Sequence, residues 1–181
     1  MAPSFYLFEY HATQHRQMDP TIILKKRATG LNQRGLAGFV VKACRAAGLR
    51  STVTVLVTGN SEIRSLNSRF RGKDRPTDVL SFPSPGCAEA FAGDIAVSLD
   101  TAARNARALG HSVGDEVKIL VLHGILHLAG YDHESDKGEM ANQEQRLRKR
   151  LGLPTALIER SSARTQPHKQ PTRRLRMRSR R

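Results

Sequence analysis

Apolar residues follow two different periods along this chain, and each period predicts one kind of element. Short runs rich in apolar and β-branched residues predict strands at 21–24, 52–57, 78–82 and 93–97. Apolar residues spaced three or four positions apart predict helices at 33–47, 61–70, 100–109, 113–128 and 136–151. The run at 113–128 is apolar on most sides, so we expect this helix to lie at the centre of the fold.

Polar residues and glycines mark the ends of the predicted helices. The expected N-caps are Asn32, Asn60 or Ser61, and Ser112, and the expected helix ends are Gly48, Gly110 and Gly130. Strands and helices are interleaved, which predicts an α+β (mixed α/β) fold with a single small mixed β-sheet packed with about five helices. The short run at 21–24 is expected at an edge of that sheet.

Charge and the pattern of predicted elements together divide the chain into three parts. The net charge of +14 and the pI near 10.8 indicate an anionic partner such as nucleic acid. Nine Lys/Arg residues and no acid lie between Arg160 and Arg181, so we expect residues 156–181 to form a disordered basic tail that can lie on a phosphate backbone. Residues 1–17 match no clear element and are expected to be a disordered N-terminal extension. The folded domain is therefore expected at 18–155.

Nothing in the sequence indicates a membrane protein or an exported one. It has no run of about 18 apolar residues, and its N-terminus lacks the basic start and long apolar core of a secretory signal. The two cysteines, Cys44 and Cys87, lie far apart without metal-type spacing. We therefore expect a cytoplasmic protein with reduced thiols and no membrane contact.

Three of the seven histidines fall within HGILHLAGYDH, residues 123–133. His123 and His127 are four residues apart on a predicted helix, so both imidazoles project from one face. A turn at Gly130 would bring His133 back to the same point. Three neutral imidazoles and one open position are typical of a catalytic zinc site, so we expect one Zn²⁺ per chain.

The residue after the first histidine separates this pattern from the HExxH metallopeptidases. Those enzymes place a glutamate base there, whereas this chain has Gly124. Glycine cannot accept a proton from water, so peptidase chemistry would lack its base. A glycine inside a helix also costs about 1 kcal/mol relative to alanine, which predicts a role in packing or in access to the metal.

A second cluster indicates the class of substrate. A basic segment before the third predicted strand carries four candidate substrate-binding residues: Arg69, Arg71, Lys73 and Arg75. This segment alone would be interpreted as a solvated loop. Beside a metal centre, however, a guanidinium is suited to hold two oxygens of a phosphodiester and to stabilise developing negative charge.

The segments FRGKDRPTDVLSFP (70–83), GDI (93–95) and HGILHLAGYDH, in this order, closely resemble the YbeY family of ribosomal-RNA maturation factors over roughly residues 20–152. This resemblance implies a cytoplasmic, single-strand-directed, metal-dependent endoribonuclease. Such an enzyme trims small-subunit ribosomal RNA in ribosome quality control, with ribosomal RNA and the small ribosomal subunit and its proteins as partners. The implied zinc ligands are His123, His127 and His133, and the implied catalytic residues are Arg71 and His123.

Other parts of the mechanism stay open in the sequence. Asp78, Asp94 and Asp132 are candidates to accept a hydrogen bond from the second ring nitrogen of a histidine, or are merely structural. Water and the RNA 2′-OH are both possible nucleophiles. Two other functions also fit the pattern: a zinc hydrolase of another substrate such as a peptide, and a zinc-stabilised RNA-binding ribosome assembly factor without catalysis.

Overall fold

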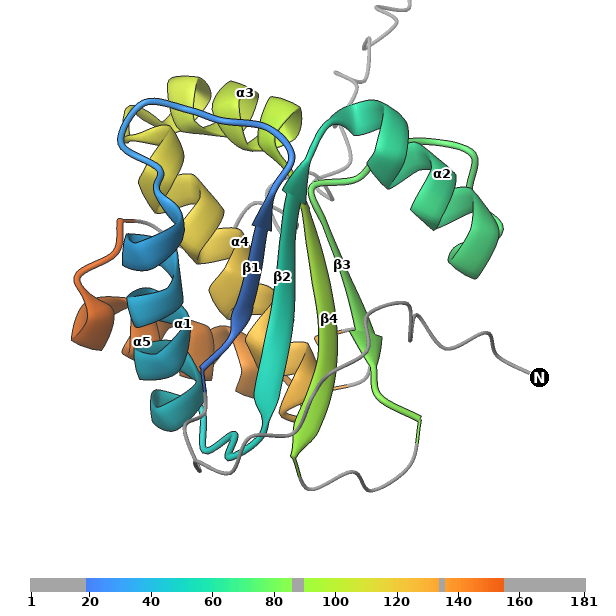
Figure 1. The fold of residues 1–181 in the computed structure, drawn as a ribbon. Helices are drawn as coiled ribbons and strands as arrows, with labels where there is room; N and C mark the ends of the chain where they lie inside the picture. Colours follow the sequence, from blue (N-terminus) through green and yellow to red (C-terminus); the bar gives the residue numbers. More distant parts are fainter. Residues whose placement is uncertain (1–18, 86–89, 134–135, 155–181) are drawn as a thin grey trace, which may run out of the picture.

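The structure is a computed structural model that describes residues 19–85, 90–133 and 136–154. Its strands are β1 (Thr21–Leu24), β2 (Thr52–Thr58), β3 (Val79–Pro83) and β4 (Phe91–Ser98). Its helices are α1 (Gln33–Ala46), α2 (Asn60–Arg71), α3 (Leu99–Leu109), α4 (Val113–Leu128) and α5 (Glu139–Leu151) (Figure 1). The predicted α+β class is confirmed. The expected N-terminal extension, the basic tail and Cys87 lie outside the described residues, so the domain boundaries stay predictions.

The strands form one mixed sheet in the order β1-β2-β4-β3. Strands β1, β2 and β4 are parallel, whereas β3 pairs antiparallel with β4. The run at 21–24 therefore lies at an edge, as its pattern predicts, and β3 forms the opposite edge.

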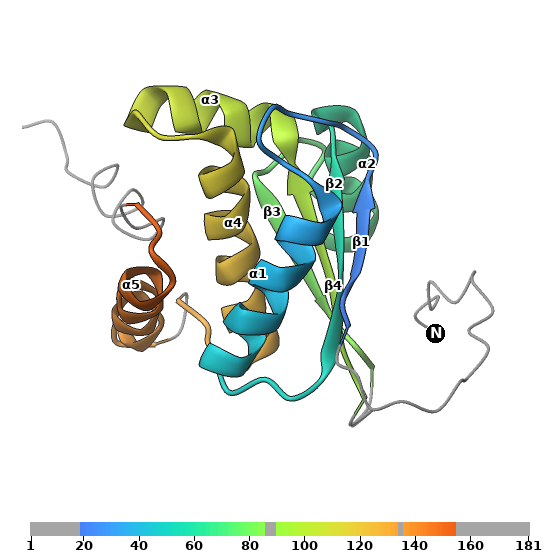
Figure 2. The same ribbon diagram turned by 60° about the vertical axis from the view of Figure 1, so that its left-hand side comes forward.

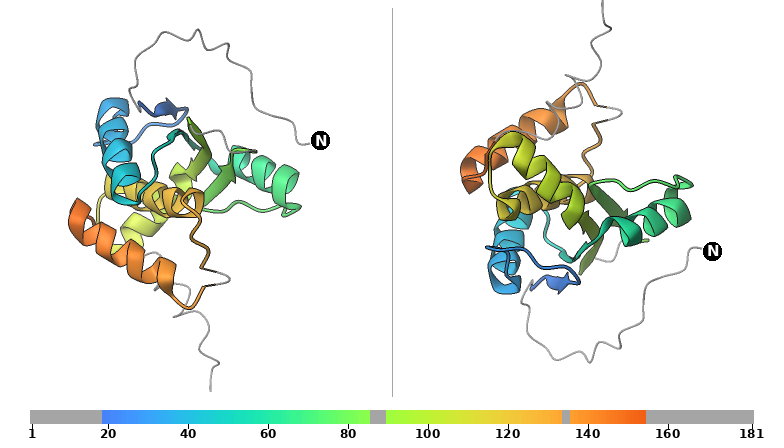
Figure 3. Two further views of the ribbon diagram at one scale, coloured as in Figure 1. Left: turned by 90° about the horizontal axis from the view of Figure 1, so that it is seen from below. Right: turned by 90° about the horizontal axis from the view of Figure 1, so that it is seen from above.

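Helices cover both faces of the sheet. Helix α2 packs on one face through Ile63, which meets Leu80 of β3 and Ala96 of β4. Helices α1 and α4 pack on the other face, and α5 lies beyond them, away from the strands (Figure 2). The end-on views show α2 separated from α1 and α4 by the sheet (Figure 3).

Helix α4 is the centre of the larger core, as its apolar run predicts. Its side chains Leu120, Leu122, Ile125 and Leu126 are fully buried between the sheet and the neighbouring helices. Ser112 caps its first turn by accepting the N–H of Asp115 at 3.0 Å. None of the described helices is long and apolar enough to span a bilayer.

Two predicted helix starts differ from those observed. Asn60 does not cap α2, because its side-chain oxygen accepts the hydroxyl of Thr101 from α3 at 3.0 Å, and Gly59 occupies the cap position instead. Helix α5 begins at Glu139 and not at Asp136, whose carboxylate accepts the N–H of Met140 at 2.7 Å from outside the helix. In both cases the polar side chain forms a hydrogen bond, but not as the N-cap residue that its position in the sequence predicts.

Candidate metal centre

The last turns of α4 and the turn that follows bring His123, His127 and His133 together. The Nε2 atoms of His123 and His127 lie 3.2 Å apart. The ring of His133 has its centre 5.3 Å from that of His123 and 5.1 Å from that of His127. One ring nitrogen from each residue falls within 4.8 Å of the others, which is a spacing at which the three could hold one metal ion.

The chain reversal that returns His133 follows from a Schellman turn at the end of α4. The N–H of Tyr131 bonds the carbonyl of Leu126 at 3.0 Å, and the N–H of Gly130 bonds that of His127 at 3.0 Å. Gly130 has φ +93°, a left-handed conformation that a glycine adopts without steric cost. The glycine predicted to end this helix therefore lies one residue past the observed C-cap, Ala129.

The second ring nitrogens of two histidines are already held. Nδ1 of His123 lies 3.0 Å from Oε2 of Glu144, and Nδ1 of His127 lies 3.0 Å from the carbonyl oxygen of Tyr131. Since both partners are acceptors, each Nδ1 donates its hydrogen, and each Nε2 keeps a lone pair. The two lone pairs are thereby available to one ion, as in sites where the other nitrogen fixes the tautomer of a ligand.

Burial favours the neutral form that a ligand needs. His123 is buried, His127 is half-buried and His133 is exposed, so the centre opens to solvent on the His133 side. Desolvation lowers the pKa of His127, and the neighbouring His123 and His133 lower it further, whereas the charge of Asp132 acts in the opposite direction. A neutral imidazole is the form that binds a metal ion.

Glu144 is a site residue that sequence reasoning did not identify. Its side chain has no exposed surface, and Arg148, which is 3% exposed, places Nη1 3.8 Å from the second carboxylate oxygen. Both residues lie on the buried face of α5 with Met140 and Leu147. A carboxylate and a guanidinium within an apolar stripe were the available signal, because such residues are buried only when they have partners.

Gly124 has the packing role that its position in the helix predicts. A Cβ at this residue would lie 2.8 Å from Cγ2 of Ile95 and 3.0 Å from Oγ of Ser81. Only a glycine lets α4 approach β3 and β4 this closely, one residue after the first histidine of the centre.

The basic segment lies on the other side of the sheet. Arg71 is the last residue of α2, and it is exposed, as are Arg69, Lys73 and Arg75. Because α2 and α4 cover opposite faces, Arg71 and the three histidines come from opposite sides of the sheet, of which β3 is one edge.

The loop after α2 is held in place by the helix itself. The buried Asn67 donates its side-chain N–H to the carbonyl of Arg75 at 2.7 Å. Arg64 binds both carboxylate oxygens of Asp74, at 2.7 and 2.6 Å. Arg71, Lys73 and Arg75 are exposed, so this fixed loop carries cationic side chains at the surface.

The three candidate aspartates lie in different environments. The side chain of Asp78 accepts the N–H of Val79 at 2.9 Å, and its backbone carbonyl accepts the N–H of Ser98, at the end of β4 remote from the histidines. Asp94 shares the α2 face with Ala96, and burial raises its pKa. Neither aspartate is the acceptor for a histidine Nδ1, because Glu144 and the Tyr131 carbonyl have that role for His123 and His127. Asp132 is exposed and adjacent to His133.

The fold and the site define a single α+β domain with a three-histidine centre of the kind that binds a metal ion. A family model described as "Endoribonuclease YbeY" matches residues 22–152. The chain is 52% identical over 153 residues to a Koribacter versatilis protein named Endoribonuclease YbeY, covering 84% of this chain and 97% of that protein. It is 56% identical over 105 residues to the protein of that name from Solibacter usitatus, covering 58% and 69%.

A solved structure is similar to this chain in fold. The solution structure of TM1509 from Thermotoga maritima matches with a TM-score of 0.52 and 30% identity, covering 85% of this chain and 100% of that one. The chain belongs to the Endoribonuclease YbeY family, and the resemblance found in the sequence motifs is confirmed.

Proposed function

We propose that this chain is a zinc-dependent endoribonuclease that cleaves single-stranded RNA, and that it acts in the maturation of small-subunit ribosomal RNA and in ribosome quality control. The observation that carries the proposal is the convergence of the His123, His127 and His133 rings in a chain of this family. Relatives of this chain are named endoribonucleases, which supports RNA as the substrate.

The donor set fits zinc. Two imidazole nitrogens bound to tetrahedral Zn²⁺ at about 2.0–2.1 Å lie about 3.3 Å from each other. The Nε2 atoms of His123 and His127 are 3.2 Å apart, close to that value before any ion is placed between them. Three nitrogen ligands also leave one coordination position open, as a catalytic zinc requires.

The proposed mechanism assigns separate roles to the metal ion and to the residues around it. A bound Zn²⁺ would lower the pKa of a water molecule and polarise a phosphoryl oxygen. Glu144 fixes the orientation of His123, and the Tyr131 carbonyl fixes that of His127. Arg71, on the opposite face of the sheet, is proposed to hold a phosphate of the bound RNA strand. Gly124 stands where the HExxH metallopeptidases have their glutamate base, so that base is absent.

The proposed partners follow from charge and family. A net charge of +14 favours binding to the phosphate backbone of ribosomal RNA. The further proposed partners are the small ribosomal subunit, which contains that RNA, and its proteins. Binding would rest on phosphate contacts, since aromatic residues make up 5% of the chain and tryptophan is absent. We also propose a cytoplasmic location, as the family resemblance implies.

The proposal is tested by metal analysis and RNA cleavage on the same preparations. We expect one zinc per wild-type chain, cleavage of single-stranded RNA, and loss of both in the His127→Ala variant. The matched control is His111→Gln, because His111 lies just before the other end of α4, and a glutamine amide keeps a donor for Glu116, which His111 contacts at 2.7 Å. The control is expected to keep its zinc and its cleavage.

Each alternative has its own outcome in that experiment. Zinc without cleavage in the wild type would indicate a zinc-stabilised assembly factor, and hydrolysis of peptides in place of RNA would indicate another hydrolase. Wild-type protein without a transition metal, or full metal content in the His127→Ala variant, would contradict the metal centre itself.

A further inference from the structure

One stretch of this chain is basic without any acidic residue. Residues 20–61 contain seven Lys/Arg residues and no Asp or Glu. Three of the seven, Arg34, Lys42 and Arg45, are exposed residues of α1. At 100° per residue, Arg45 lies about 20° and Lys42 about 80° from Arg34 around the helix axis. The three therefore share one face, opposite the buried face of Leu36, Phe39, Val40, Ala43 and Cys44.

These charges are not neutralised by the described part of the fold. Two cations just before α1 in the chain do have carboxylate partners: Lys25 binds Glu62 at 2.6 Å, and Lys26 binds Asp100 at 2.7 Å. The ion pairs found among residues 19–85, 90–133 and 136–154 include none from Arg34, Lys42 or Arg45. The α1 face is thus a concentrated positive surface rather than a mixed one.

The same face has room for close approach. Gly38 lies between Arg34 and Lys42 on α1, about 40° from Arg34 around the axis. A Cβ at Gly38 would meet no atom within 4 Å, so the fold does not require a glycine there. Its missing side chain lets a phosphate reach the helix surface between the flanking cations.

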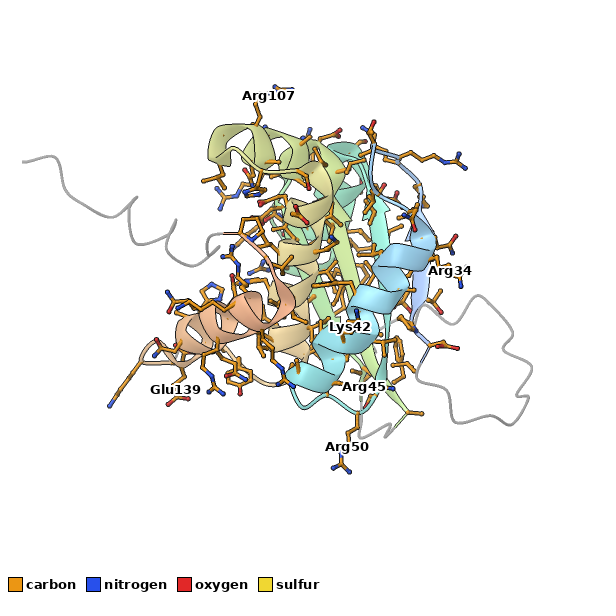
Figure 4. All side chains as sticks on the ribbon, turned by 90° about the vertical axis from the view of Figure 1, so that its left-hand side faces the viewer. Arg34, Lys42, Arg45, Arg50, Arg107 and Glu139 are labelled. Carbon is orange, nitrogen blue, oxygen red and sulfur yellow. The ribbon has the colours of Figure 1, made fainter. Side chains whose placement is uncertain are left out.

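The basic face ends beside the histidine centre. Figure 4 shows Arg34, Lys42 and Arg45 following one another along α1, with Arg50 beyond its last turn, toward the end of the fold at which α4 finishes. Ala47, just past α1, shares a pocket of about 290 Å³ with Gly130, Tyr131 and Asp132, which directly precedes His133. Carboxylates of Asp132, Asp136 and Glu139 line that pocket, so the pocket itself is unsuited to an anion.

We propose that the exposed face of α1, formed by Arg34, Gly38, Lys42 and Arg45, is a second RNA-binding surface that holds the phosphate backbone beside the cleavage site. It rests on the proposed function, since it takes RNA as the substrate. Arg34 and Arg45 are about 16 Å apart along the helix, so the surface spans several phosphates. Its contacts are with phosphates alone, which makes them independent of base sequence.

The test compares two double variants of the full, zinc-loaded chain. Lys42→Gln/Arg45→Gln removes two charges from the α1 face, and Arg104→Gln/Arg107→Gln removes two exposed charges from α3. A fluorescein-labelled single-stranded RNA of mixed sequence is the probe, and its anisotropy is read on ice across a salt series. Zinc content, melting temperature and the kcat and KM of RNA cleavage are measured on the same samples.

We expect the α1 pair to bind RNA about tenfold more weakly at low salt, with a slope of log affinity against log salt shallower by about 1.4. KM should rise while kcat, zinc content and melting temperature stay at wild-type values. The α3 pair should match the wild type. Equal affinities and slopes for the two pairs would overturn the proposal, even where cleavage and zinc confirm the enzyme.

A second comparison keeps the size of the added side chain constant. Gly38→Glu places a carboxylate among the three cations, and Gly38→Gln places a neutral group of the same shape there. We expect Gly38→Glu to bind the RNA probe more weakly than Gly38→Gln. Equal affinity for the two would contradict a phosphate at this position. A wild type that binds RNA but does not cleave it would contradict the proposed function and leave both comparisons valid.

Discussion

The carboxylate of Glu144 accepts a hydrogen bond from the His123 ring across 3.0 Å, although 21 residues separate the two in the chain. Both side chains are buried, and Arg148 stands one turn beyond Glu144 on the same helix. Helix α5 therefore contributes to the histidine centre without supplying a ligand. It fixes the imidazole that is most deeply buried.

Replacing Glu144 should weaken the metal centre. We expect Glu144→Gln to lower zinc affinity about tenfold to a hundredfold, because the amide is a poorer acceptor for the His123 N–H. Glu144→Ala should in addition reduce the free energy of unfolding by about 3 kcal/mol, since it removes the carboxylate beside the buried Arg148. Zinc competition with a chromogenic chelator and urea unfolding measure the two effects.

The control for Glu144 comes from the same helix. Glu139→Gln changes an exposed carboxylate in the first turn of α5 and should leave both zinc affinity and unfolding unchanged. If Glu144→Gln bound zinc as tightly as Glu139→Gln, the hydrogen bond to His123 would have no part in holding the metal.

The features of the site that could be predicted from the sequence are those set by residues close together in the chain. His123 and His127 are one helical turn apart, and a glycine follows that helix, so their convergence with His133 could be derived from local geometry. The partner of His123 could not, because it lies on another helix, and its position depends on how α5 packs against α4. The same holds for Asn60, whose local capping signal was overridden by a contact from α3.

Two glycines in helices make a matched pair for a stability test. Gly124→Ala should reduce the free energy of unfolding by about 1 kcal/mol, because forcing a methyl group against Ile95 and Ser81 outweighs the gain in helix propensity. Gly38→Ala should raise it by up to about 1 kcal/mol, since its Cβ meets nothing. Urea titration of both variants gives the comparison. Stabilisation by Gly124→Ala would show that α4 can move away from the sheet at little cost.

Arg71 should affect cleavage and not the fold. It is exposed at the end of α2, so Arg71→Ala is expected to lose most RNA cleavage while zinc content and melting temperature stay near those of the wild type. Arg107→Ala, an exposed arginine on α3, is the control and should cleave normally. Normal cleavage by Arg71→Ala would remove this residue from the mechanism, and loss of zinc would make its role structural.

The basic tail should serve affinity rather than chemistry. Residues 160–181 carry nine Lys/Arg residues and no acid, and the family match ends at residue 152. We expect a chain that ends at Glu159 to keep its zinc, its melting temperature and its turnover at saturating RNA. Its affinity for RNA should fall, because each phosphate of single-stranded RNA that the tail no longer neutralises removes about 0.7 from the slope of log affinity against log salt.

A salt titration of the full and the shortened chain decides between two partners for the tail. A shallower slope in the shortened chain means that the tail neutralises phosphates, and the change divided by about 0.7 gives the number of phosphates that it neutralises. This number can be compared with the change in slope caused by Lys42→Gln/Arg45→Gln, and the two should add if the tail and α1 hold different phosphates. Equal slopes for both chains would mean that the tail does not touch RNA, and its nine charges would then require an acidic protein as their partner.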